Sequence, residues 1–564
     1  MTSLSYKIFM KEVESRLNKM SKTEVEKLII HWAGKELPAN RQAFIKKLSL
    51  PKQQEITKID GKALLDEIEA FARRVKSGEY CDGWGWDDVI YEERDWGDES
   101  WADEADEFFM EARELLLNGD YKQAKEAYKR LFEILEMGEE PGHLPGDPNS
   151  HDMLEVDIAE QIALYLRAIY LDSPPLERQA RLFKTIDEYR YLACNIGLED
   201  IINVLDSELS DFDAFLTGWV KFLEDQKNIK VSRLLREAVV LQGGVTAISV
   251  LARQHADQYP RAYLDWIKAL GEEGGVDSVI AVAREGLMAI PKDYRVRAEV
   301  AEAISRLGEE LNDNDLKLEG YRESFYSNPS INYLLDLYVT AIECDCLKTV
   351  QDRAELRLWE LFKQDKEPVV YNYHHAELSR ACLSENVLYR ALVLGGRYVE
   401  LFELCKGKGS LGWSGGNNPK PFFISLTMVL LSNNGKHSNI IDKQWNNLMA
   451  GTAYNLDNEL VNKYKKIIAA TSRSIKLTKE QEEFYLKWCC NEIGKRVDGI
   501  IGNKYRKSYH KAADLLVAMA ETLTNRGEKQ KGVDLITKYR SKYPRHSAFK
   551  GELTRSMQES GSIA

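Results

Sequence analysis

The chain of 564 residues carries 77 Lys and Arg against 90 Asp and Glu, a formal net charge of −13, and its length allows either several domains or one continuous helical solenoid. Its first residues contain no apolar segment of signal-peptide length, and no later stretch approaches the roughly 18 apolar residues of a membrane span. With eight cysteines in no regular pattern, these features exclude a disulfide scaffold and predict a soluble, cytoplasmic protein without membrane association.

Residues 1–80 are predicted to form N-terminal helices. Apolar residues recur at helical spacing in two segments between Ile8 and Leu50, on either side of a break at Pro38. A further helix is expected from about Gly61 to Ser77.

Residues 81–137 combine an acidic, tryptophan-rich segment with a helical hairpin. Between Cys81 and Glu107, Arg94 is the single basic residue beside 12 Asp and Glu. Acidic residues at this density favour exposure, whereas tryptophan is costly to leave in water, so we expect the segment to bind another surface, of this chain or of a partner. The partner-binding candidates are Trp84, Trp86, Trp96 and Trp101.

The run from Ala112 to Phe132 has the spacing of small and aromatic residues that is typical of a tetratricopeptide-like hairpin. After a Gly- and Pro-rich loop at 138–149, residues 153–405 are predicted to form a helical-repeat domain. Helical segments at 276–290, 296–307 and 316–326, and later at 511–523 and 532–543, each present one apolar face that a neighbour must cover. The predicted fold is therefore all-α, an irregular tetratricopeptide-like solenoid.

Residues 406–421 interrupt this pattern with five glycines and two prolines, a composition that cannot continue a helix. The charge changes sign at the same place: residues 406–564 carry 27 Lys and Arg against 14 Asp and Glu, net +13, and the preceding residues are net −26. We expect a flexible linker here, followed by a basic C-terminal helical domain at 422–564. Alternatively, residues 406–421 form an ordered surface loop capped by Trp413. The charge difference between the two parts of the chain has an alternative explanation too, a drift in composition without function.

Motifs for catalysis, metal binding and cofactor binding do not emerge from the sequence. The Gly-Lys pairs lack the other residues of a phosphate loop, and Cys344-Asp-Cys346 and Cys489-Cys490 lack zinc-ligand spacing. We expect no catalytic residue, metal or cofactor.

A basic run between positions 504 and 511 interleaves tyrosines with cations. Its candidate partner-binding residues are Lys504, Arg506 and Lys507. An acidic protein partner, or a plain solvated helix face, is favoured over direct nucleic-acid binding because the local charge excess is moderate.

Most of the chain resembles a family of bacterial helical-repeat proteins. The resemblance rests on the segments Asp95–Asp98 with Ala105–Phe108, Asn118–Tyr121, Glu319–Pro329, Leu411–Ser414 with Asn418–Pro419, and Lys542–Arg545. In length and layout the chain also resembles the protein substrates of type III-E CRISPR operons. That resemblance implies an antiviral regulator that craspase, a guide-RNA-activated caspase-like protease complex, cuts once. It also implies partners released by the cut, namely an extracytoplasmic-type sigma factor and an accessory operon protein.

A protease needs about eight residues in extended form, which an intact helix cannot supply. The candidate cleavage region is therefore the start of the linker, at Lys406, Gly407, Lys408, Gly409, Ser410 and Leu411, with the loop 432–436 as a second choice. Two other functions stay open: a constitutive scaffold without regulated cleavage, and an enzyme whose histidine and cysteine or carboxylate converge only in the fold.

Overall fold

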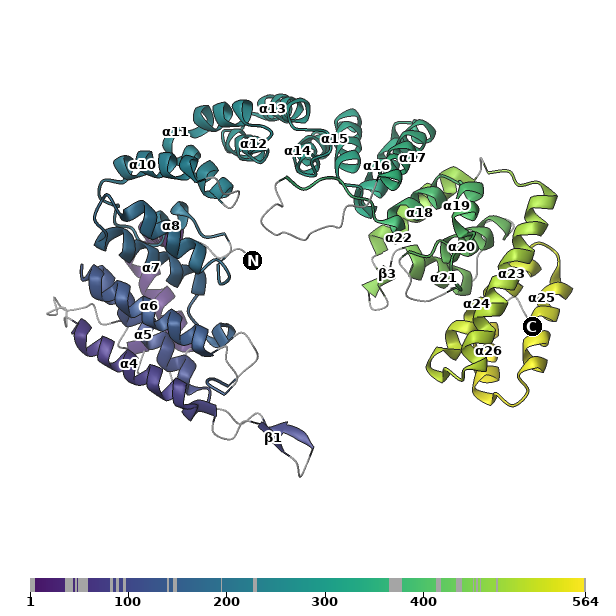
Figure 1. The fold of residues 1–564 in the computed structure, drawn as a ribbon, viewed down its shortest axis with the longest axis horizontal. Coiled ribbons are helices and arrows are strands. Elements are labelled where there is room, and N and C mark those ends of the chain that lie inside the picture. The colour runs from purple at the N-terminus through teal and green to yellow at the C-terminus, as the bar shows by residue number, and fades with distance from the viewer. Residues whose placement is uncertain are drawn as a thin grey trace. The chain divides into compact units, whose positions relative to one another are not determined.

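The computed structural model describes most of the chain, and every structural statement below concerns the described residues. These are residues 6–35, 44–45, 48, 59–81, 85–87, 91–94, 98–138, 142–145, 150–193, 195–226, 231–364, 378–411, 417–432, 439–449, 451–452, 455–456, 458–472 and 475–561. They form two compact units, an N-terminal unit (residues 1–247) and a C-terminal unit (residues 248–564). Both are built from helices, with two short two-stranded ribbons between helices, so the chain is all-α as predicted (Figure 1).

The N-terminal unit contains the first ten described α-helices and one ribbon. The helices are α1 (Tyr6–Asn18), α2 (Lys22–Lys35), α4 (Gly61–Ser77), α5 (Ser100–Leu117), α6 (Tyr121–Gly138), α7 (Ile158–Asp172), α8 (Arg178–Glu188), α9 (Leu198–Asn203), α10 (Phe212–Asp225) and α11 (Ser232–Gln254), whose last turns belong to the C-terminal unit. The ribbon pairs β1 (Gly85–Asp87) with β2 (Glu92–Arg94) antiparallel, Trp86 opposite Glu93.

Local sequence explains where these helices begin and end. The Asp60 carboxylate accepts from the backbone N–H groups of Lys62 (3.0 Å) and Ala63 (3.4 Å) at the start of α4, and Gly78 closes the helix in the left-handed conformation. The predicted helix at 61–77 is confirmed. The predicted hairpin is also confirmed: α5 and α6 pack together, and α4 and α7 cover α6.

The C-terminal unit contains α12 (Ala262–Glu272), α13 (Val276–Ala289), α14 (Val296–Glu310), α15 (Asn314–Ser327), α16 (Ile331–Glu343), α17 (Leu347–Lys363), α18 (Glu385–Leu394), α19 (Tyr398–Cys405), α20 (Lys420–Leu431), α21 (Asn439–Met449), α22 (Asn458–Ser472), α23 (Lys479–Gly502), α24 (Tyr509–Asn525), α25 (Lys529–Lys542) and α26 (Ser547–Ser560). A ribbon of β3 (Gly451–Thr452) and β4 (Asn455–Leu456) lies between α21 and α22. The helix pairs predicted from the sequence at 276–326 and 511–543 correspond to α13–α15 and α24–α25.

Each helix from α12 to α18 packs on the next along the chain, the arrangement of a helical-repeat solenoid. The helices α14 and α15 pack closely on each other. A Cβ at Gly320 would lie 2.4 Å from the backbone nitrogen of Ser305, so glycine is required where α15 crosses α14.

One hydrophobic core runs through the C-terminal unit from Phe325 to Leu553, with contributions from both sides of residues 406–421. The helices that flank this segment, α19 and α20, pack on each other, and both carry buried apolar residues of the same core. The predicted domain boundary at 406–421 is therefore wrong. The division between compact units falls within α11 instead, and the core joins residues 325–405 of the first predicted domain to the predicted domain 422–564. Gly and Pro content did not reveal this core, because it reports only local backbone conformation.

By length and composition α11 is the one described helix apolar enough to cross a membrane. Its backbone is not continuous, because Gly244 has non-helical angles (φ 57°, ψ −147°). Its N-terminal half buries Leu234, Leu235 and Ala238, as a core helix does.

Candidate functional site

The candidate cleavage loop (residues 406–411) follows the last turn of α19. Lys406 to Ser410 are exposed, Gly407 adopts the left-handed conformation (φ +74°), and no helix or strand includes these residues. Leu411 differs, because it is buried in the core of the C-terminal unit. Lys406 pairs with Glu403 at 2.6 Å, a contact local to the end of α19.

A side-chain hydrogen bond holds the far side of the loop. Asn418 Nδ2 donates to the carbonyl oxygen of Ser410 at 3.1 Å, and α20 begins two residues later. Trp413, the predicted cap, lies outside the described residues. The described part of the segment is thus an exposed turn anchored at both ends.

Four aromatic rings, here called the aromatic cluster, join the helices that the loop connects. Phe402 of α19 lies 5.1 Å from Phe423 of α20, measured between ring centroids. Both rings contact Tyr485 of α23 at 5.1 Å, and Trp488 lies 5.2 Å from Phe402 and 5.4 Å from Phe423. Such contacts do not depend on the chain being continuous through the loop.

A buried ion pair lies beside this cluster. Lys420 Nζ in the first turn of α20 is 2.8 Å from Glu492 Oε2 of α23, and the side chains are 9% and 6% exposed. Lys495, on the surface, also binds Glu492 at 2.7 Å. Burial on its own raises the pKa of the Glu492 carboxyl, but the hydrogen bonds from Lys420 and Lys495 outweigh it and hold the pKa below its ordinary value.

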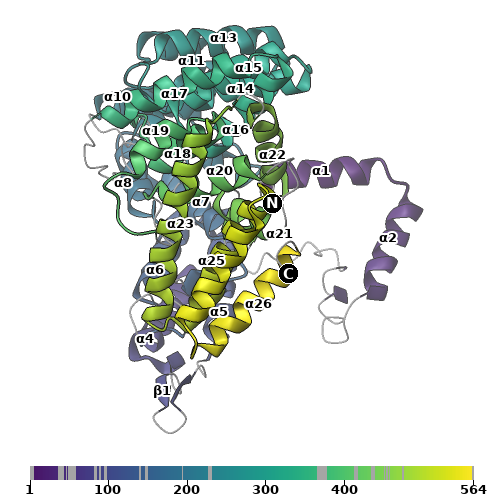
Figure 2. The same cartoon turned by 90° about the vertical axis from the view of Figure 1, so that its right-hand side faces the viewer.

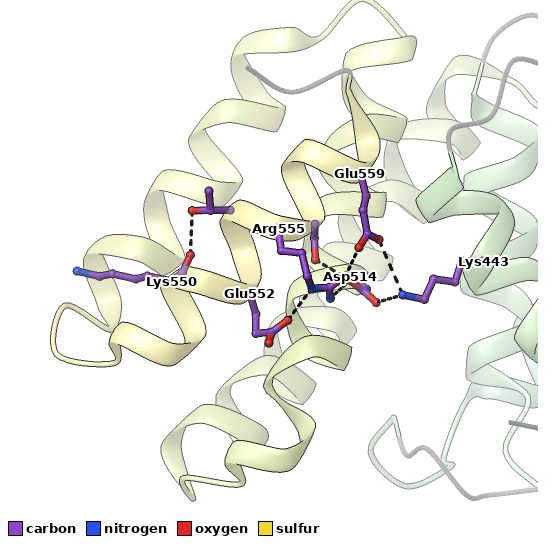
Figure 3. Close-up of polar contacts among 8 residues, drawn as sticks. Lys443, Asp514, Lys550, Glu552, Arg555 and Glu559 are labelled. Carbon is purple, nitrogen blue, oxygen red and sulfur yellow. Dashed lines mark hydrogen bonds and ion pairs between the residues drawn. The ribbon is translucent and has the colours of Figure 1, made fainter. Parts of the chain in front are cut away.

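A second buried carboxylate joins the last helices (Figure 3). Asp514 of α24 accepts hydrogen bonds from Lys443 of α21 (3.1 Å), Arg555 of α26 (3.1 Å) and the Ser556 hydroxyl (2.6 Å). Because each oxygen is paired with a cation or hydroxyl, the burial of Asp514 is compensated. The network fixes α21, α24 and α26 relative to one another.

Two ion pairs cross from the helices before the loop to those after it. Lys463 of α22 lies 2.7 Å from Asp336 of α16, and Lys466 lies 2.8 Å from Glu343. These pairs are partly exposed, so each contributes at most about 1 kcal/mol.

Part of the acidic segment is docked on the chain itself. Glu104 accepts from Arg74 and from the Tyr80 hydroxyl (2.9 Å), and Asp106 accepts from the backbone N–H groups of Glu155 (2.8 Å) and Val156 (3.2 Å). Burial, reinforced by the bond to Glu104, raises the pKa of Tyr80. Two carboxylates that the sequence predicts to be exposed therefore have hydrogen-bond partners in the N-terminal unit.

Trp101 is fully buried in the first turn of α5. The prediction that it binds a partner is wrong, since its indole is packed inside the N-terminal unit. Trp84 and Trp96 lie outside the described residues, as does the side chain of Trp86.

We expect Trp101→Phe to lower the free energy of unfolding of the N-terminal unit by ~1–2 kcal/mol, because the smaller ring leaves part of the site empty. The indole N–H has no acceptor among the described residues, so the loss is one of packing. Urea unfolding measures it, with the exposed Trp32→Phe as the matched control. Equal stability of both variants would contradict the buried position.

The structure places Lys504, Arg506 and Lys507 together in the exposed connection between α23 and α24. Tyr505 between them is 61% exposed. This basic loop is separated along the chain from the cleavage loop, and the two are different candidate sites.

The most buried cysteines are not reactive thiols. Burial raises the pKa of Cys405 to about 12 and raises that of Cys489 further. In the part of the chain that the structure describes, no group of three or more His, Cys, Asp or Glu is placed to hold a metal ion.

No family model matches the chain, and no curated protein matches it. Eight chains of solved structures are similar, among them one from the structure of Naa15/Naa10 bound to HypK-THB, at 12% identity and a TM-score of 0.18. The match covers 89% of this chain and 66% of that chain, just under two thirds of its length. The helical-repeat fold rests on the packing of this chain's own successive helices.

Sequence reasoning did not find the aromatic cluster or the Lys420–Glu492 pair. Phe402 and Phe423 are near in sequence, but Tyr485 and Glu492 come about sixty to seventy residues later, and only the fold brings them together. Nothing in the sequence distinguishes Glu492 from exposed glutamates on the same helix.

Proposed function

We propose that the chain is a non-enzymatic, cytoplasmic protein-interaction scaffold that a protease regulates by one cut in the cleavage loop. The observation that carries the proposal is the exposed, non-helical turn at residues 406–410 between two helices of one core. A site of this kind admits a protease without prior unfolding of a helix.

The resemblance to type III-E CRISPR substrates supplies the candidate protease, the RNA-activated caspase-like craspase. In this proposal the scaffold holds an extracytoplasmic-type sigma factor or an accessory operon protein, and cleavage changes that binding during antiviral defence. No cofactor or metal takes part.

Constitutive scaffolding is the second candidate function. It is favoured by the continuity of the core across the loop, because a cut there leaves the apolar contacts of the C-terminal unit in place.

Incubation with target-RNA-activated craspase tests the proposal, with intact-mass analysis of the products. We expect one cut between residues 406 and 411, slowed in the variant Lys406→Ala with Lys408→Ala. The matched control is Lys476→Ala with Lys479→Ala, which removes two exposed cations elsewhere in the C-terminal unit. An uncut chain beside a substrate that is cut would reject regulated cleavage and leave the constitutive scaffold.

A further inference from the structure

Two loops far apart in sequence lie together at one end of the last four helices. One joins α23 to α24 (residues 503–508) and the other joins α25 to α26 (residues 543–546). The His546 ring lies 6.4 Å from that of Tyr509 and 5.4 Å from that of Tyr543, so the side chains beneath the two loops are in contact. Figure 2 shows α23, α25 and α26 running beside one another.

Five cations, here called the basic surface, occupy these loops and the first turn of α26. They are Lys504, Arg506, Lys507, Arg545 and Lys550. None has a carboxylate within ion-pair distance among the residues that the structure describes. The Lys550 side chain points away from Glu552 and Glu559 (Figure 3).

Neighbouring carboxylates are already engaged. Asp498 binds Lys542 at 2.7 Å and the Tyr543 hydroxyl at 2.7 Å, and Glu552 binds Arg555 at 2.9 Å. The positive charge of the basic surface is therefore not neutralised locally, and it is available to an acidic ligand.

Tyr505 adds an apolar contact at the centre of this charge. It is 61% exposed and is flanked by Lys504 and Arg506. An exposed tyrosine between cations is typical of a surface that binds a ligand carrying both negative charge and a flat or apolar group.

We propose that the basic surface binds a short acidic protein segment that contains an aromatic residue. The inference rests on the proposed scaffold function and gives the chemistry of one partner. A short peptide meets only the local cations, since charges beyond about 8 Å are screened at physiological salt.

A long nucleic acid fits this surface less well. The basic surface offers one exposed tyrosine, whereas a single strand stacks several bases in succession.

Fluorescence anisotropy of the full chain with a short fluorescein-labelled peptide of Asp and Glu around one Trp tests the proposal. Arg506→Gln with Lys507→Gln in one loop, and Arg545→Gln with Lys550→Gln in the other, should each weaken binding roughly fivefold. Tyr505→Ala should weaken binding of this peptide but not of the same peptide with Ala in place of Trp. The matched control, Lys465→Gln with Lys487→Gln, should bind as the unmodified chain does.

Three results would overturn the inference: no binding, equal weakening in the control variant, or an effect confined to one of the two loops. Tighter binding of a single-stranded RNA of equal charge, lost in the same variants, would assign the surface to nucleic acid instead. Unchanged melting temperatures exclude misfolding as the cause. Failure of the peptide to bind leaves the scaffold proposal standing, because cleavage in the loop 406–411 is measured separately.

Discussion

A chain cut once between Lys406 and Leu411 is expected to elute as a single species at about 1 M salt, where the Debye length is ~3 Å. The two pieces carry opposite charge, −26 and +13 when divided at position 406, so electrostatic attraction is one way to hold them. The structure supplies a stronger one. Helices from both pieces bury apolar side chains in one core, and the aromatic cluster joins α19 to α20 and α23.

The free energies of ion pairing and of apolar burial show which of the two holds the pieces together. The partly exposed pairs Lys463–Asp336 and Lys466–Glu343 contribute at most about 1 kcal/mol each and are screened by salt. Burial of one large apolar side chain contributes ~1.5–3 kcal/mol, and the core contains many on each side of the cut.

Limited proteolysis followed by size-exclusion chromatography in low and high salt makes the measurement. Denaturing electrophoresis confirms that the chain is cut, and urea should separate the pieces. Separation in high salt alone would show that charge holds the pieces together and that the core across the loop is weaker than the structure indicates.

Glu492→Gln is expected to lower the free energy of unfolding of the C-terminal unit by ~3–5 kcal/mol, because it leaves the buried Lys420 ammonium without its counter-ion. The double variant Lys420→Met with Glu492→Leu removes both charges and should lie much closer to the unmodified chain. Urea unfolding followed by circular dichroism gives the values. Lys495→Ala, which removes the exposed partner of the same carboxylate, is the control and should cost about 1 kcal/mol or less.

The same pair predicts a pH dependence. The folded pKa of Glu492 lies below its ordinary value of 4.5, so its contribution is fully present above about pH 4.5 and is lost as the pH falls through the folded pKa. The stability difference between the unmodified chain and Glu492→Gln should therefore narrow in acid. A difference that stays constant from neutral to acidic pH would contradict the ion pair.

Helix positions were predictable because they depend on local signals. The helix 61–77 has its cap residues, Asp60 and Gly78, at both ends, and the hairpin of α5 and α6 shows its apolar spacing. The domain boundary was not predictable in the same way. Whether α19 and α20 share a core depends on residues such as Tyr485, more than sixty positions later.

The sequence did contain a signal that Trp101 is buried. Trp101, Ala105, Phe108 and Ala112 recur at helical spacing and form the buried face of α5, so this tryptophan belongs to a helix rather than to the acidic segment before it. Only part of the basic surface could be predicted from the sequence. Lys504 and Arg506 stand in one basic run, but Arg545 joins them only through the topology of the last helices.

The continuity of the core across residues 406–411 has a consequence for assembly. A chain that stays joined after a cut behaves as two complementing fragments, whose reunion from separate solutions is a bimolecular folding reaction. The pieces 1–408 and 409–564, made as separate polypeptides, would then reconstitute the C-terminal unit on mixing, and its stability would rise with concentration. After a cut in this loop the two pieces would therefore separate slowly, at a rate set by how often the core opens.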